Sequence, residues 1–127
     1  GTGSISLTTT ISGNIWVDSV TASGDTVTIT SAGLIEELGS DPGADIVAAT
    51  LDLNAVTGIG TLSAIELTGT TISADTVNGN VDLNSLAIGT VTVTSLTTGT
   101  GNIQFDQTGG QILNVTTSTT TKLEMLR

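Results

Sequence analysis

A short motif of glycine, asparagine and alternating residues recurs at a fixed interval along this chain. The segments GNIWVD, GNVDLN and GNIQFD begin at Gly13, Gly79 and Gly101. The interval from the first segment to the second is three times the interval from the second to the third. Repeats of this length are typical of solenoids, in which each turn of chain stacks on the one before. The shorter interval therefore predicts coils of about 22 residues.

Alternation of apolar and polar residues indicates that the coils consist of short strands. Apolar-x-apolar units occur throughout the sequence, and β-branched residues, which favour strands, are abundant. When the chain is folded at the repeat interval, apolar side chains align in columns. Two such columns are Ile15, Val81, Ile103 and Ile5, Val27, Val93, Val115. We predict an all-β fold, a parallel β-helix (β-solenoid) whose like residues stack into ladders.

A β-sandwich is the main structural alternative, because its turns recur every 8–12 residues and such spacing also occurs here. The repeat columns and the low aromatic content, 2%, favour the solenoid. We expect one domain over residues 1–127. We also expect it to be a fragment of a longer repeat protein, since the sequence starts and stops within repeat-like segments.

Between residues 31 and 74 the apolar residues no longer align in these columns at the repeat interval. Within this region, residues 34–45 contain the only proline and place Glu37 where a core residue is expected. We interpret 34–45 as an acidic excursion from the coil, either a loop or a single helical turn around Leu34–Leu38.

The charge of the chain excludes several classes of function. The net charge is -10, and the two basic residues, Lys122 and Arg127, lie near the C-terminus. Nucleic-acid binding requires lysine and arginine to displace counterions from phosphates, so it is excluded. No apolar run approaches the roughly 20 residues that cross a bilayer, so membrane insertion is not expected.

Catalysis is not expected. The chain has no histidine, and acid–base sites of parallel β-helix enzymes that act on polysaccharides need basic partners. Two carboxylates alone can hydrolyse a glycoside, and Asp18 and Asp106 occupy equivalent repeat positions. We interpret both as turn residues, whose side chains bond to nearby backbone. No cofactor is expected.

Calcium is the one metal that the composition suggests, because hard cations prefer carboxylate oxygens. The four acids of the excursion form a weak candidate cluster: Glu36, Glu37, Asp41 and Asp45. The glycine-rich repeat that binds calcium in some solenoids is absent. A solvated acidic loop is therefore the favoured interpretation.

Outward-facing residues supply candidates for surface contact. Trp16 lies between two inward residues, so it is expected to point outward, where it could stack on a sugar or anchor a protein. Two segments, TVTIT and TVTVT, present outward threonines, as ice-binding solenoids do. The rows do not recur on consecutive coils, which a regular ice plane needs, so ice binding is less favoured. The threonines are Thr26, Thr28, Thr30, Thr90, Thr92 and Thr94.

Three segments carry a resemblance to a known family: GNIWVDSVTASGDTVTITSAGLI, ADIVAATLDLNAVTGIG and GNIQFDQTGG. They resemble the β-strand repeats of large bacterial filamentous-haemagglutinin-like surface adhesins, over roughly residues 3–121. The resemblance implies a right-handed parallel β-helix that is secreted or displayed on the bacterial cell surface. It also implies a non-catalytic role as a stalk or adhesive segment.

The expected partners follow from the stacked architecture. The two ends of a β-solenoid expose unpaired strand edges, which flanking repeats or other copies of the chain must cover. Assembly into an extracellular filament by end-to-end stacking is therefore an alternative function. Host or surface glycans are candidate partners of an adhesive segment.

Overall fold

The computed structural model describes residues 2–110, 112–116, 118–119 and 122–126, and this part of the chain is all-β without a helix. The strands are short, as the alternating units predict. They are β1 (Ile5–Thr8), β2 (Ile15–Val17), β3 (Val20–Ser31), β4 (Leu34–Glu37), β5 (Ile46–Ala55), β6 (Gly58–Ile59), β7 (Ile65–Thr68), β8 (Thr71–Thr76), β9 (Val81–Ser85), β10 (Val91–Thr98), β11 (Asn102–Gln107), β12 (Leu113–Val115), β13 (Ser118–Thr119) and β14 (Lys122–Leu126).

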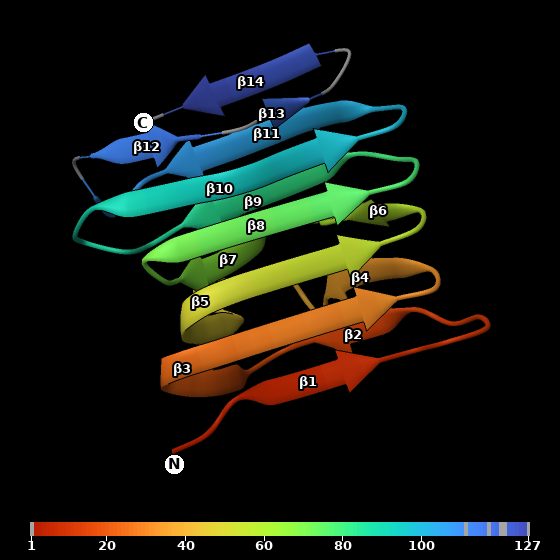
Figure 1. Ribbon diagram of the computed structural model, residues 1–127, viewed down its shortest axis with the longest axis horizontal. Coiled ribbons are helices and arrows are strands. Elements are labelled where there is room, and N and C mark those ends of the chain that lie inside the picture. Colours follow the sequence, from red (N-terminus) through yellow and green to blue (C-terminus); the bar gives the residue numbers. More distant parts are fainter. Residues whose placement is uncertain (1, 111, 117, 120–121, 127) are drawn as a thin grey trace.

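The strands stack into a β-solenoid of about five turns with roughly 22 residues per turn, which confirms the predicted fold class. All pairings between strands are parallel, and they join each coil to the next. In Figure 1 the front face contains β1, β3, β5, β8 and β10, and β2, β4, β6, β9 and β11 lie behind it. The front strands run to the right and the chain returns behind them as it climbs, so the coil is right-handed (Figure 1).

The first halves of β3 and β5 form a third, narrower side together with β7. Val20 of β3 pairs with Ile46 of β5, which pairs with Leu67 of β7. β3 and β5 then bend and continue into the front face, where Val27 pairs with Leu51. Each long strand therefore contributes to two sides of the coil.

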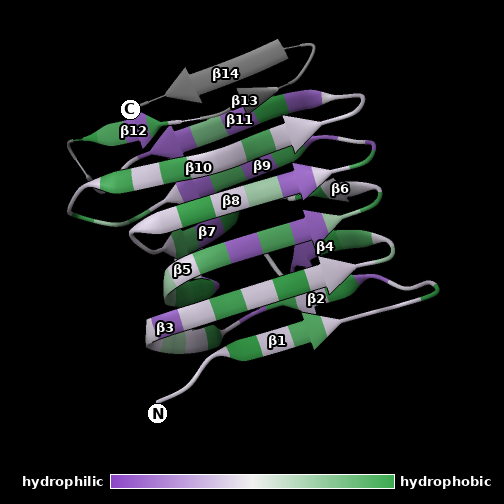
Figure 2. Ribbon diagram, viewed as in Figure 1, coloured by the Kyte–Doolittle hydropathy of each residue, from purple (hydrophilic) through white to green (hydrophobic). Residues whose placement is uncertain are grey.

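Apolar ladders fill the interior. Front strands alternate between apolar and polar residues along their length (Figure 2), and the apolar residues are the buried set. The predicted columns are confirmed, and the structure completes them with residues of the irregular region. One is Ile5, Val27, Leu51, Ile72, Val93 and Val115, and another is Ile15, Ile35, Ile59, Val81 and Ile103.

The repeated glycine and asparagine form the corner between the front and rear faces. Gly79 and Gly101 have φ values of 86° and 125°, which residues with side chains rarely adopt. A Cβ atom on Gly79 would collide with the backbone oxygen of Thr57 on the preceding coil. The Oδ1 atom of Asn80 accepts a hydrogen bond at 2.9 Å from the backbone N–H of Asn102 on the next coil. In a coil that carries the motif, the glycine therefore permits a close turn over the coil below, and the asparagine bonds to the coil above.

The interpretation of residues 34–45 is wrong in part. Leu34–Glu37 is strand β4, which pairs with β2 and β6 inside the coil, so no helical turn forms there. Residues 38–44 contain no strand and lead from β4 into β5. The insertion lengthens this coil, which is why the repeat columns slip.

Candidate functional site

Three carboxylates converge where the loop 38–44 returns to the coil. Glu37 ends β4, Asp45 immediately precedes β5, and Glu66 lies on β7 in the following coil. One carboxylate oxygen from each residue lies within 4.8 Å of the others. Glu37 is 3% exposed and Asp45 is 1% exposed. We call these three residues the acidic cluster.

Backbone hydrogen bonds hold the acidic cluster in place. The N–H of Asp41 donates to Glu37 Oε1 at 2.8 Å, which draws the loop over the cluster. The N–H of Glu66 donates to Asp45 Oδ2 at 3.0 Å, across the interval of one coil. Two further oxygens of the cluster, Glu37 Oε2 and Glu66 Oε2, are buried and have no hydrogen-bond partner among the described residues.

Burial and mutual repulsion disfavour the charged state of the cluster. Desolvation, together with the charges of Glu37, Glu66 and Asp41, raises the pKa of Asp45 to about 7. Desolvation and the charge of Glu37 likewise raise the pKa of Glu66. Carboxylates that cannot all be ionised at low cost are suited to sharing a cation or a proton.

The four acids that the sequence singled out do not form one group. Glu36 points away from the acidic cluster and accepts hydrogen bonds from the backbone N–H groups of Thr61 and Leu62, at 2.8 and 3.1 Å. It also accepts one from the Thr61 hydroxyl. Asp41 is exposed and orients the loop by accepting the N–H of Gly43 at 2.6 Å.

The expectation of a solvated acidic loop is wrong for three of these acids, because Glu36, Glu37 and Asp45 are buried. Glu66 is the member that sequence reasoning missed. Its position 21 residues after Asp45, about one coil, is the signal that could have found it.

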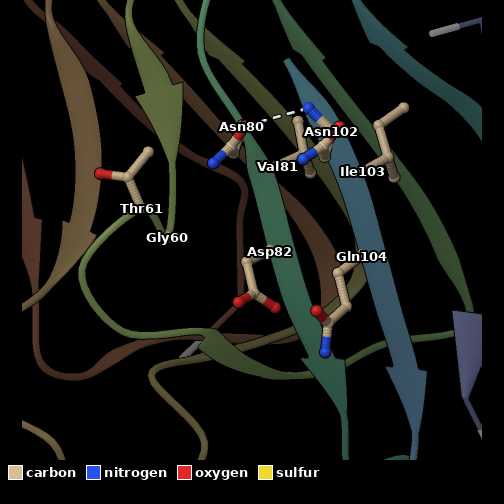
Figure 3. A pocket seen from close by; sticks show the side chains of 8 residues that line it. All are labelled: Gly60, Thr61, Asn80, Val81, Asp82, Asn102, Ile103 and Gln104. Atoms are coloured by element: carbon tan, nitrogen blue, oxygen red, sulfur yellow. Dashed lines mark hydrogen bonds between the residues drawn. The ribbon is translucent and has the colours of Figure 1, made fainter. Parts of the chain in front are cut away.

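A second polar feature lies on the rear face, where a pocket of about 130 Å³ opens beside β9 and β11. Figure 3 shows Asp82 of β9 beside Gln104 of β11, with Thr61 on the opposite side of the pocket. Desolvation and the charges of Asp106 and Glu36 raise the pKa of Asp82. Asp82 Oδ1 and Asp106 Oδ1 are buried without hydrogen-bond partners among the described residues.

The interpretation of Asp106 as a turn residue is wrong, whereas Asp18 does lie in a turn. Asp18 is exposed in the short turn between β2 and β3. Asp106 instead lies within β11 beside Asn84 of β9. The two carboxylates are not brought together, and neither lines the pocket beside Asp82.

Trp16 lies on the outer side of β2 and is 48% exposed, as expected from the alternation. Of the threonines, Thr26, Thr28 and Thr30 are partly exposed on β3. Thr92 belongs to β10, whereas Thr90 precedes that strand.

The structure corrects the expectation that outward threonines do not recur on consecutive coils. One outward column has threonine on consecutive coils, namely Thr26, Thr50, Thr71 and Thr92. The neighbouring columns contain Asp52 and Asp75, so the threonine array is one column wide there. A register shift also interrupts β10 at Thr94. These features do not favour ice binding.

No protein-family model, curated protein or solved structure matches the chain. Among the described residues, no helix has the length and apolarity that crossing a membrane would require.

Proposed function

We propose that this chain is a non-catalytic structural segment of a bacterial surface or secreted protein, where it forms part of a stalk or adhesive rod. The continuity of the core ladders carries this proposal. The column that begins at Ile15 of β2 continues through β4, β6 and β9 to Ile103 of β11. Each coil is held by its neighbours, so such a stack spans distance as one body.

The distribution of charge supports an extended rod. Every charged residue between positions 2 and 116 is acidic. Like charge along the walls keeps neighbouring rods apart in solution and disfavours contact with polyanions.

Immunogold electron microscopy of intact cells of the source organism tests this proposal. Antibodies raised against the purified chain are expected to label a layer outside the cell envelope. Brief protease treatment of intact cells should remove the label. Labelling that appears only after permeabilisation would contradict a role at the surface.

An alternative is that copies stack end to end into an extracellular filament. The first coil favours it, because Leu7 is 36% exposed whereas its register partner Ile29 is fully buried. Among the described strands, β1 pairs with β3 and with no other strand. An apolar inner face beside a strand edge that no described strand covers is suited to receiving another coil.

Static light scattering over a concentration series tests the alternative. If the chains form filaments, the average particle mass should rise with protein concentration. At the same concentration, the Leu7→Lys variant should have a lower average mass than the parent chain. Leu62→Lys is the matched control, because Leu62 is 76% exposed in a corner loop away from the first coil. A strict monomer at all concentrations would exclude the filament and leave the stalk.

A further inference from the structure

We propose that the acidic cluster of Glu37, Asp45 and Glu66 binds a calcium ion that joins two consecutive coils. The proposal goes beyond a passive stalk, because it makes the rigidity of this part of the rod depend on a divalent cation. It rests on the chemistry of the three side chains, on their spacing and on the buried oxygens that lack partners.

The spacing of the oxygens fits calcium. Calcium–oxygen distances are about 2.3–2.6 Å, so ligands on opposite sides of the ion lie roughly 4.6–5.2 Å apart. The three carboxylate oxygens of the cluster lie within 4.8 Å of one another. No pair of these oxygens is therefore too far apart for one ion to contact all three residues.

The free oxygens are the independent observation that points to a ligand. The exposed fraction of Glu37 is 3%, and its Oε2 atom has no hydrogen-bond partner among the described residues. Glu66 Oε2 is also buried without such a partner. Buried carboxylate oxygens are costly unless they are paired or coordinate a metal. A cation held by the cluster would give these two carboxylates the interaction that they lack.

The donor set selects the kind of cation. All three ligands are carboxylates, and the chain contains neither histidine nor cysteine, which transition metals prefer. Magnesium demands near-ideal octahedral geometry and gives up its bound water reluctantly, whereas calcium accepts irregular oxygen sets. The buried, asymmetric cluster therefore suits calcium better than magnesium.

The loop and the coil each contribute to the site. Glu37 and Asp45 stand at the two ends of the loop 38–44, and Glu66 belongs to the next coil. An ion held by all three closes the base of the loop and adds a link between coils. The link lies at the end of the longest coil, which runs from Val20 to its register partner Ile46.

Isothermal titration of the chelator-treated chain with calcium chloride is the primary test. We expect one saturable site with a Kd of about 10⁻⁴–10⁻³ M, the range of extracellular calcium modules. Glu66→Gln should weaken binding at least tenfold. Asp18→Asn is the matched control, because it removes one charge from an exposed residue and should leave the Kd unchanged.

Thermal unfolding gives a readout that a general charge effect would not produce. In chelator, Glu66→Gln should unfold at a higher temperature than the parent chain, because it relieves repulsion. Calcium should raise the Tm of the parent by on the order of 10 °C at about 100 times Kd. The rise should be lost in Glu66→Gln and retained in Asp18→Asn.

Terbium luminescence provides a third measurement on the folded protein. Trp16 is the chain's only tryptophan and neighbours Val17, the register partner of Glu37. Terbium at the cluster should therefore be sensitised by Trp16, and calcium should displace it. Absence of a saturable site would overturn the proposal. So would equal effects of calcium and magnesium in all three proteins, because that pattern indicates charge screening.

Discussion

The front face and the acidic cluster both contain carboxylates, but in opposite environments. On the front face the carboxylates accept hydrogen bonds from hydroxyl groups, whereas in the cluster they face one another. On the front face, Asp75 Oδ1 accepts hydrogen bonds from Ser95 and Thr97 on the next coil, at 2.7 and 2.5 Å. Ser73 Oγ donates to Asp52 Oδ1 at 3.0 Å. In the cluster, carboxylates face other carboxylates, and two buried oxygens lack partners among the described residues.

The difference teaches that stacking converts sequence spacing into chemistry. Each residue of a coil lies beside its register partner, so a carboxylate below a hydroxyl gains a hydrogen bond. A carboxylate near other carboxylates loses solvent and gains repulsion. The first arrangement stabilises the wall of the rod, whereas the second costs stability unless a cation or proton is shared.

Substitution at the corner should have the largest effect, because the corner joins the front face to the rear. Gly79→Ala places a Cβ against the backbone oxygen of Thr57 and forces alanine to a φ of 86°. We expect a loss of about 2–4 kcal/mol in the free energy of unfolding, measured by urea denaturation. Gly89→Ala is the control, since its Cβ would meet no atom within 4 Å. Equal stability of the two variants would refute the account of the corner.

Neutralising a carboxylate on the rear face should stabilise the chain, whereas removing one from the front face should destabilise it. Burial and the charges of Asp106 and Glu36 raise the pKa of Asp82 above its ordinary value of 3.8. The folded state therefore binds the proton more tightly than the unfolded state. Stability falls as the pH rises from that ordinary value to the folded pKa, and the penalty is complete above it.

Asp82→Asn removes this penalty. It should raise the free energy of unfolding at pH 7 by at most about 1 kcal/mol, because Asp82 is partly exposed and water screens its charge. It should have little effect near pH 3, where Asp82 is largely protonated in both states. Urea denaturation at the two pH values measures the difference. A gain of the same size at both would show that Asp82 ionisation is not its cause.

Removing a front-face carboxylate should have the smallest effect and the opposite sign. Asp75→Ala deprives Ser95 and Thr97 of their acceptor, but Asp75 is partly exposed and water can replace it. We expect a loss of about 0.5–1 kcal/mol in the free energy of unfolding. Asp75→Asn should recover most of it, because the amide oxygen still accepts. A gain in stability on Asp75→Ala would contradict the proposed difference between the carboxylates of the front face and the rear face.

Much of the fold could be predicted from the sequence because its causes are local or periodic. Alternating β-branched residues favour short strands, and the repeated Gly-Asn motif marks the corners. The spacing between Gly79 and Gly101 determined the coil length and the main ladders. The outward position of Trp16 followed from the same alternation.

The tertiary structure alone decided which carboxylates meet. Coil length varies, because the step from Val20 to its partner Ile46 is longer than the repeat interval, whereas the step from Leu67 to Ser85 is shorter. A fixed period cannot identify neighbours where coils lengthen or shorten. Glu37 and Glu66 therefore came together, and Glu36 was separated from them, because an inserted loop shifted the register and strand alternation set which side each residue faces.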